Sequence, residues 1–502
     1  MLTGCSLPVL EKRTQSAALP TAQAQETRLG RAIAAQLSAH AGLTGIDPLA
    51  DSHAAFAARV NLARAAQRTL DVQYYIWRND LTGILLLEEL REAADRGVRV
   101  RLLLDDNGIP SSLDEILAAL DAHPAIEVRL FNPFAIRRPK AANFVTDFSR
   151  LNRRMHNKSF TADGVATIIG GRNIGDEYFG ATDGVVFADL DVLAVGPAAA
   201  DVARDFDRYW ASASSYPATQ ILRPAGLDQL DLLDQRARAL QGDAAAIAYV
   251  TAIRETPDVS ELLAGSLSFE WASTRMISDD PDKVLNRAPP TTHMLKQLRE
   301  ILGDPRRELD LVSPYFVPTE EGTRYFTQLA SSGTRVRVLT NSLEATDVVA
   351  VHSGYARRRA ELLNSGVELF ELRRRSPDNG DSNEKSPGVF GSSESSLHAK
   401  TFAVDADRVF IGSLNFDPRS ANLNTELGFV VDSPALATRI ESIFSTLAPQ
   451  LAYTVRLDGN GKLYWLEQRG NDVIRYDTEP HSAWSTRLGV WFYSILPIEW
   501  LL

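Results

Sequence analysis

The chain has 502 residues, of which 44% are hydrophobic and 8% aromatic, so it can form two or three domains with a sizeable core. Its net charge of −11 gives no general attraction to nucleic acid, and we expect no nucleic-acid partner. The single cysteine, Cys5, excludes an intramolecular disulfide and a cysteine-rich metal site. The sequence contains no run of about 20 apolar residues of the kind that predicts a membrane-spanning helix.

Residues 1–45 are predicted to form a leader rich in Ala, Gln, Ser and Thr, with one helix from Thr27 to His40. The opening MLTGCS resembles a bacterial lipobox, in which the cysteine is lipidated after signal cleavage, so Cys5 is a lipidation candidate. Only four residues precede Cys5, which leaves no room for the apolar part of a signal peptide. Two interpretations stay open: a lipoprotein signal shortened by a late start codon, or a chance match.

The first half, residues 46–215, alternates predicted helices and strands. The helix-spaced run FAARVNLARAAQRTL precedes the aromatic, β-branched strand LDVQYYIW, and the helix GILLLEELREAADRG precedes the strand VRVRLLLDD. Gly97 closes the second of these helices. Such alternation predicts βαβ units and a mainly parallel sheet flanked by helices.

The same series returns in a second half, residues 291–450. RRELDLVSPYFVP is predicted to be a strand, GTRYFTQLASSG a helix closed by Gly333, and TRVRVLTNS the next strand. We therefore predict a duplication of two similar α/β halves. Residues 216–290 are predicted to be a connector, and residues 451–502 a C-terminal hairpin and a tryptophan-rich tail.

The polar segment 373–396 is rich in Gly, Pro and Ser and has no hydrophobic period. Loops of this length in compact domains are often lids or disordered inserts. Because little in the segment could pack, an insert is the favoured interpretation.

One short motif occurs twice, as MHNKSFTAD and LHAKTFAVD, and a Gly-(Gly/Ser)-x-Asn turn follows each copy. On a strand, residues two apart point to the same face, so each half presents an imidazole beside an ammonium group. Two copies with the same offsets argue against coincidence. The residues concerned are His156, Lys158, Asp163 and Asn173 in the first half, and His398, Lys400, Asp405, Ser413 and Asn415 in the second.

These side chains suit displacement at a phosphorus ester. One neutral imidazole can form a covalent phosphoryl intermediate, and a second can protonate the leaving oxygen. The two lysines and two asparagines, with Ser413 and backbone donors, can hold the oxygens on which charge develops. Because the lysines supply the positive charge and no carboxylate or cysteine cluster accompanies them, we expect no metal and no cofactor.

Both motifs resemble the HxKxxxxD signature of the phospholipase D superfamily, whose members pair two such halves around one active site. The resemblance implies that the two HxK strands meet at a pseudo-twofold interface, and that Asp163 and Asp405 are mostly structural. It also implies that a further acidic residue orients each histidine. Counting back from the prolines of DLDVLAVGP and ELGFVVDSP gives Asp189 and Glu426 for this task, with Asp191 as the alternative to Asp189.

Longer runs resemble the bacterial cardiolipin synthases, especially their C type, from about residue 55 to the C-terminus. They include LDVQYYIW, TDFSRLNRRMHNKSF, GGRNIGDEYFG, HSGYARRR, GSLNFDPRSANLNTE and SILPIEWLL. The resemblance implies a phosphatidyltransferase that makes cardiolipin from phosphatidylglycerol, with phosphatidylethanolamine as a second candidate substrate. It favours His156 as the nucleophile, because the family more often uses the N-terminal motif.

Three classes of function stay open at this point. A hydrolytic phospholipase D, or another phosphodiesterase, shares every catalytic residue with the transferase and differs in whether water or a lipid alcohol attacks the phosphohistidine. A non-catalytic lipid-binding module fits less well, because both motifs are complete. The motifs do not identify a helper protein.

Phospholipid substrates require contact with a membrane surface, so we expect a bacterial peripheral membrane enzyme. Lipidation of Cys5 would place it on the periplasmic face, and otherwise the cytoplasmic face is expected. The tail WSTRLGVWFYSILPIEWLL carries Trp484, Trp491 and Trp500. These residues predict an interfacial anchor, with burial against the body as the alternative.

Two further groups of residues have open interpretations. His352 and the residues 357–359 lie on a predicted helix whose basic face either attracts anionic headgroups or is simply solvated. Four aromatic residues end the equivalent first strands, where they either line an acyl or glycerol pocket or pack in the core. They are Tyr74, Trp77, Tyr315 and Phe316.

Overall fold

The computed structural model describes residues 6–11, 13–182, 185–241, 246–247, 249–251, 258–374 and 395–502. Cys5 lies outside the described residues, and so does nearly all of the polar segment 373–396. The expectations for lipidation and for that segment therefore stay predictions.

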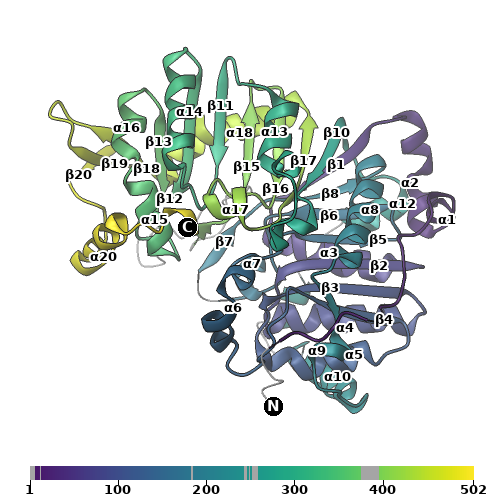
Figure 1. The fold of residues 1–502 in the computed structure, drawn as a ribbon. Helices are drawn as coiled ribbons and strands as arrows, with labels where there is room; N and C mark the ends of the chain where they lie inside the picture. Colours follow the sequence, from purple (N-terminus) through teal and green to yellow (C-terminus); the bar gives the residue numbers. More distant parts are fainter. Residues whose placement is uncertain are drawn as a thin grey trace.

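The first half carries one sheet with helices packed on it (Figure 1). Its strands lie side by side in the order β9-β4-β3-β2-β5-β6-β8-β1. The strands are β1 Thr44–Leu49, β2 Thr69–Ile76, β3 Arg99–Gly108, β4 Ile126–Phe131, β5 Ser159–Ala162, β6 Ala166–Gly170, β7 Val186–Ala188, β8 Asp191–Val195 and β9 Ser215–Pro217. The helices are α1 Thr21–Gln25, α2 Arg28–Ala39, α3 Ser52–Ala65, α4 Leu81–Asp95, α5 Asp114–Asp121, α6 Asn143–Leu151, α7 Asp176–Phe179 and α8 Pro197–Ala211.

The second half repeats this plan, with the strand order β17-β16-β15-β11-β12-β13-β18-β19-β20. Its strands are β11 Glu308–Val312, β12 Arg335–Asn341, β13 Glu368–Leu372, β14 Ser395–Leu397, β15 Thr401–Val404, β16 Arg408–Gly412, β17 Leu427–Asp432, β18 Ala452–Leu457, β19 Leu463–Arg469 and β20 Asp472–Tyr476. Its helices are α13 Met294–Leu302, α14 Thr319–Ser331, α15 Val349–Ala356, α16 Arg359–Asn364, α17 Pro418–Asn422, α18 Pro434–Ser442, α19 Ala448–Leu451 and α20 Trp484–Ile495. The predicted duplication of two α/β halves is thus confirmed.

The sheets are less parallel than expected. Strands β2, β3 and β4 are parallel, as are β11, β12 and β13, and these are the βαβ units that the sequence predicted. The strands that carry the repeated motif instead form antiparallel hairpins, β5–β6 and β15–β16. The short turns that close the hairpins allow only this direction. They begin at Asp163 and Asp405, whose φ angles of 54° and 56° lie in the left-handed region that aspartate tolerates.

The connector joins the two halves through one long strand, β10 (Glu270–Ser278). β10 pairs with β1 of the first half and with β17 of the second, both antiparallel, so one sheet runs through the whole molecule. The rest of the described connector contains the helices α9 Ala218–Ile221, α10 Asp228–Gln241 and α12 Asp258–Ala264.

The two halves also share part of their apolar core. A single cluster contains Ile169 and Val192 from the first half together with Ile411 and Phe429 from the second. Because apolar side chains pack across the contact, the relative position of the two motif strands is fixed by core packing.

The C-terminal region extends the second sheet and then returns to the body. Strands β18, β19 and β20 form an antiparallel meander on β13, and α20 then packs on α15. A short 3₁₀ turn, Glu499–Leu501, follows α20, and the last residue, Leu502, is buried. Among the described residues, no helix combines the length and apolar character needed to cross a membrane.

The expectation of a basic helix face is wrong for His352 and Arg359, which do not face solvent. His352 and Arg359 are buried, and the Arg359 guanidinium bonds to His352 Nε2 at 2.6 Å and lies 3.0 Å from Glu371. Glu479, just before α20, also pairs with Arg359. The cationic groups are therefore neutralised by carboxylates inside the fold, and only Arg357 remains exposed.

The aromatic residues at the ends of the first strands adopt the packing alternative. Tyr74, Trp77 and Phe316 are buried in the two cores. Tyr315 is half-buried, and its hydroxyl donates to Asp347 at 2.7 Å.

Candidate active site

Each HxK segment is bound to a segment of the opposite half. The backbone N–H of His156 donates to the carbonyl of Thr425 at 2.9 Å, and the N–H of Thr425 donates to Arg154 at 3.0 Å. On the other side, the N–H groups of His398 and Ala399 both donate to the carbonyl of Ala188, at 2.8 and 3.0 Å. These backbone bonds bring the two repeated motifs into one buried site at the interface.

The recorded neighbours of the His156 Nδ1 atom are all hydrogen-bond acceptors. Nδ1 lies 3.1 and 2.9 Å from the two carboxylate oxygens of Glu426 and 3.2 Å from the carbonyl of Ser413. Nδ1 must therefore carry the proton and donate it to Glu426. This tautomer leaves Nε2 with a free lone pair, which is the form that a nucleophile needs.

His398 has a different pair of neighbours at the same ring atom. Its Nδ1 lies 2.6 Å from Asp189 Oδ2 and 2.8 Å from Lys400 Nζ. A donor and an acceptor therefore compete for the same nitrogen, and when the lysine donates, the ring proton lies on Nε2. As a general acid, His398 needs a proton on both ring nitrogens, so that Nδ1–H donates to Asp189 and Nε2–H can be given up to leave a neutral imidazole. Asp191, the alternative to Asp189, pairs instead with Arg59 at 2.7 Å.

The two carboxylates are held differently. Glu426 accepts hydrogen bonds from the hydroxyls of Ser413 and Ser420, the latter at 2.7 Å. Burial alone would raise the pKa of Glu426, but His156, Lys158 and the Ser413 hydroxyl together hold that pKa below its ordinary value. Glu426 is therefore a fixed, ionised acceptor.

Within the described residues, no serine hydroxyl donates to Asp189. Gly171 occupies the place of Ser413, and a Cβ there would lie 2.1 Å from Asp189 Oδ1. The Asp189 carboxylate accepts from the N–H of Leu190 at 2.8 Å and from His398. Burial raises the pKa of Asp189, and the nearby Lys400 only partly opposes the shift.

Burial also determines the charge state of the four motif bases. It lowers the pKa of Lys158 to about 7 and that of Lys400 to about 8. It lowers the pKa of His156 to about 4, although Glu426 opposes this shift. The pKa of His398 is also well below its ordinary value, because of burial and then of Lys400. Near neutral pH both imidazoles are therefore uncharged, and the two lysines lie close to their titration points.

The two motif asparagines are not equivalent. Asn173 accepts from the N–H of Ile76 at 3.1 Å and donates to the hydroxyl of Tyr178 at 3.0 Å, so its amide is used in holding the local fold. The buried Oδ1 atom of Asn415 has no hydrogen-bond partner within the described ranges.

The two motif aspartates cap the starts of the first strands. The Asp163 carboxylate accepts from the backbone N–H groups of residues 67, 68 and 69, which lead into β2. The Asp405 carboxylate accepts from those of residues 306, 307 and 308, which lead into β11. Among the described residues, neither carboxylate is hydrogen-bonded or ion-paired to a histidine, and the structural role stays a prediction.

Sequence reasoning missed two kinds of residue in this site. Ser420 was not identified, and nor were the aromatic rings on the histidines: Tyr75 lies 5.0 Å from the ring of His156, and Phe187 lies 5.1 Å from that of His398. Strand periodicity could have identified Tyr75, because it lies on the opposite face of β2 from the core residue Tyr74. Ser420 precedes Glu426 by six residues and lies on α17, outside both repeated motifs, so the motif comparison did not include it.

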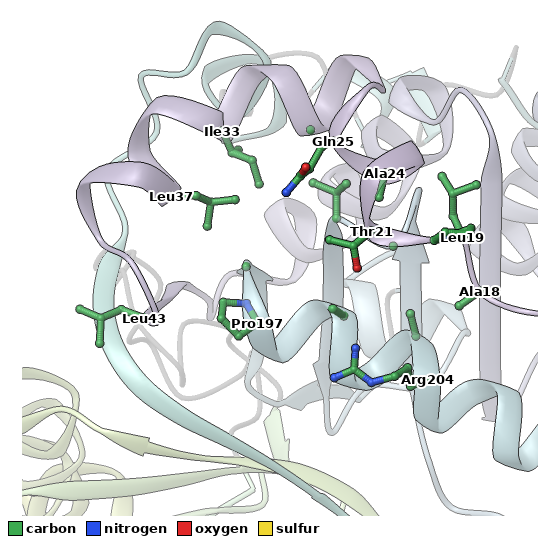
Figure 2. A pocket seen from close by; sticks show the side chains of 18 of the residues that line it. Ala18, Leu19, Thr21, Ala24, Gln25, Ile33, Leu37, Leu43, Pro197 and Arg204 are labelled. Carbon is green, nitrogen blue, oxygen red and sulfur yellow. The ribbon is translucent and has the colours of Figure 1, made fainter.

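One cavity of the first half lies away from this site. It has a volume of about 480 Å³ and is enclosed by the leader helices α1 and α2 on one side and by α8 on the other (Figure 2). Its lining is mainly apolar, with Ile33, Leu37 and Leu43 pointing toward it. None of the repeated-motif histidines or lysines lines this cavity. Across the described ranges, His, Cys, Asp and Glu side chains do not gather in groups of three that could hold a metal ion.

The site joins two histidines, two lysines and two carboxylates, and each half supplies one of each. This is the two-half arrangement that the resemblance to the phospholipase D superfamily implied. The chain belongs to the family described as "Cardiolipin synthase, PLD-like domain", which matches residues 60–210 and 298–448, once in each half.

The chain is similar to two particular cardiolipin synthases and to one solved structure. The chain is 47% identical to cardiolipin synthase C of Escherichia coli K12, over 95% of this chain and 100% of the relative. It is 27% identical to a cardiolipin synthase of Geobacillus thermodenitrificans, over 76% of this chain and 61% of the relative. Among solved structures, the phosphatidylserine synthase of Haemophilus influenzae has a similar fold, with a TM-score of 0.55 and 14% identity, over 84% of this chain and 92% of that one.

Proposed function

We propose that the protein is a phosphatidyltransferase that makes cardiolipin from membrane phospholipids through a phosphohistidine. The observation that carries this proposal is the 47% identity to a cardiolipin synthase C along the whole of that relative, in a chain that retains both HxK motifs. Phosphatidylglycerol is the acceptor, and either phosphatidylglycerol or phosphatidylethanolamine is the donor.

The first step is attack on the donor. Nε2 of His156 forms a bond to the phosphorus, and the bond from phosphorus to the headgroup oxygen breaks. His398 acts in its imidazolium form, which the phosphate of the bound donor favours: it gives its Nε2 proton to that oxygen and becomes neutral, while its Nδ1–H stays on Asp189, so glycerol or ethanolamine leaves as a neutral alcohol group. The protonated forms of Lys158 and Lys400 stabilise the charge that builds up on the non-bridging oxygens.

The second step transfers the phosphatidyl group to the acceptor. The terminal glycerol hydroxyl of phosphatidylglycerol attacks the phosphorus, and His398, now unprotonated at Nε2, takes up its proton. The bond from phosphorus to Nε2 of His156 breaks, and cardiolipin leaves. His398 then carries a proton on Nε2 again, as it did at the start of the cycle.

The experiment that tests this function uses purified protein and labelled phosphatidylglycerol, with and without phosphatidylethanolamine. Formation of labelled cardiolipin, with release of one headgroup alcohol for each cardiolipin, is the expected result. Phosphatidic acid without cardiolipin would overturn the proposal in favour of a hydrolytic phospholipase D, since water would then be the acceptor.

The enzyme reaches its substrates as a peripheral membrane protein, and α20 is the element that we propose contacts the bilayer. Trp484 and Trp491 are 71% and 59% exposed, and Trp500 just beyond the helix is 56% exposed. Tryptophan favours the headgroup region, so an apolar helix face of this kind fits an interface rather than water. Lipidation of Cys5 would add a second attachment and would place the enzyme on the periplasmic side; without it the cytoplasmic side is expected.

Point substitutions test the tail better than its removal, because Leu502 packs in the body and its carbonyl accepts from the N–H of Arg419 at 3.2 Å. We expect W484S/W491S to lower the ratio of vesicle turnover to micelle turnover by roughly tenfold, because the loss of buried aromatic area weakens attachment. The matched control is Leu232→Ser, which changes an exposed leucine on α10 and should leave the ratio unchanged. An unchanged ratio in W484S/W491S would contradict the role of α20.

A further inference from the structure

Helix α6 of the first half presents large apolar side chains to solvent. Val145 is 87% exposed and Phe148 is 45% exposed. Phe144 lies between the surface and the body, with its ring 6.3 Å from that of Phe148 and 5.7 Å from that of the buried Phe134. The backbone kinks at Asp147, between Val145 and Phe148, so these two residues lie on two adjoining helical turns. Exposed apolar groups that gather on one short segment mark a contact surface more often than scattered single residues do.

This helix leads directly into the active site. α6 ends at Leu151, and only the residues 152–155 separate it from His156. A surface that α6 contacts is therefore adjacent to the site in which the phosphatidyl group is transferred.

A single arginine holds the end of α6 and the end of the C-terminal tail together. The Arg419 guanidinium donates to the side chain and to the carbonyl of Asn152, both at 2.8 Å, and to the carbonyl of Leu501 at 3.2 Å. Asn152 caps α6, and Leu501 closes the turn after α20. α6 and α20 lie on the same side of the molecule, on either side of the C-terminus (Figure 1). The two apolar helices, one from each half, thus share an anchoring point.

The chain around α6 also carries positive charge that the fold does not neutralise. Arg138 is exposed and donates to the carbonyl of Ser111, and Arg153 donates to the carbonyls of Lys283 and Asn422. Within the described part of the chain, the recorded partners of these two guanidinium groups are backbone carbonyls, not carboxylates. Because the whole chain has a net charge of −11, such local cations are what an anionic lipid surface could attract.

We propose that α6 is a second membrane-contacting element, and that α6 and α20 together hold the mouth of the active site against one anionic lipid bilayer. The proposal rests on the proposed function, because substrates that reside in a bilayer are the reason for such contact. The apolar side chains of both helices enter the headgroup boundary, and Arg138 and Arg153 face the phosphates. Two attachment points also fix the orientation of the enzyme, which one helix cannot do.

A fluorescent label at position 145 tests the contact directly. The label is attached to V145C in a Cys5→Ser background, with vesicles of phosphatidylglycerol and phosphatidylethanolamine as the probe. We expect a blue shift on vesicle binding and quenching by lipids with brominated acyl chains. The same label at L232C on α10 should keep its emission in water. A label at position 145 that stays in water while the tail tryptophans are quenched would overturn the proposal.

A second measurement separates this proposal from the proposed function. We expect V145S/F148S to lower the ratio of vesicle turnover to micelle turnover by roughly tenfold, and Leu232→Ser to leave it unchanged. The ratio in V145S/F148S staying at the unsubstituted value would contradict the proposal. If the unsubstituted protein makes no cardiolipin in micelles or vesicles, the proposed function fails, while the label at position 145 still reports whether α6 enters the bilayer.

Discussion

The two halves of the active site contain the same motif but hold their histidines differently. Glu426 is fixed by two serine hydroxyls and keeps a low pKa, whereas Asp189 has Gly171 beside it in place of a serine and has a raised pKa. Environments that move the pKa values of paired groups apart are the usual basis for distinct acid and base roles. The comparison teaches that duplication supplied two equivalent imidazoles, and that the residues around their carboxylates made them different.

The largest effect should come from replacing each histidine. We expect both His156→Asn and His398→Asn to lower cardiolipin formation by at least about 10³-fold, because each removes a reacting group. A donor lipid with a p-nitrophenyl headgroup needs no acid, so it should restore formation of the phosphoenzyme in His398→Asn but not in His156→Asn. Mass spectrometry of the trapped adduct makes the measurement. An adduct on His398 in the His156→Asn variant would reverse the assignment.

The next effect concerns the small residue beside Asp189. Gly171→Ser places a side chain where a Cβ would lie 2.1 Å from Asp189 Oδ1, so it should displace the carboxylate rather than reproduce the Ser413–Glu426 contact. We expect roughly a hundredfold loss of kcat, since His398 loses its orienting partner. The natural control is the reverse change, Ser413→Gly, which leaves more room and should cost less. Equal activity of Gly171→Ser and the unsubstituted enzyme would contradict the close approach.

Ser420 should have a smaller effect that shows in the pH profile. Ser420→Ala removes one donor to a buried carboxylate, which should cost about 1.5–3 kcal/mol and so about 10- to 150-fold in kcat/KM. The pKa of Glu426 then rises, so the acid limb of the kcat/KM profile moves to higher pH. Ser420→Thr keeps the hydroxyl and should recover most of the activity. A uniform loss with an unshifted acid limb would indicate a purely structural role.

The two lysines predict how anion binding depends on pH. Their pKa values of about 7 and about 8 mean that both lose their charge as pH rises through this range. Sulfate, which keeps its charge there, should bind to the site of the unliganded enzyme most tightly below about pH 7, roughly tenfold more weakly at pH 8, and up to about a hundredfold more weakly for each further pH unit, where both lysines lose their proton. Calorimetric titration measures this. Lys400→Arg should flatten the dependence, because arginine stays protonated; an equally steep curve in that variant would exclude Lys400 as the titrating group.

The smallest effect should separate the two strand caps. Asp163 is fully buried and Asp405 lies near the surface, although each accepts from three backbone N–H groups. We expect Asp163→Ala to lower the free energy of unfolding by about 2–3 kcal/mol and Asp405→Ala by about 1 kcal/mol. Urea denaturation measures both. The order would be wrong if Asp405→Ala proved the more damaging.

Sequence patterns predicted much of the fold. The catalytic roles of the site residues stay proposals. The repeated series of strands and helices predicted the duplication, and β2, β3, β11 and β12 form where the apolar patterns placed them. The mainly parallel sheet was predicted too broadly, because hairpin turns reverse the chain at the motif strands. His352 and Arg359 were misjudged because a helix pattern cannot show that carboxylates of other segments will bury them.

By itself the sequence determined the local features of this protein: the two HxK motifs just before β5 and β15 and most helix and strand boundaries, all of which depend on residues close together in the chain. Only the tertiary structure decided that Glu426 of the second half lies against Nδ1 of His156 and that Asp189 of the first half lies against Nδ1 of His398. The same holds for the shared anchor of α6 and the tail at Arg419. The physical reason is that these contacts join residues brought together by the shared core and by β10, and the periodicity of a single element carries no information about its distant partners.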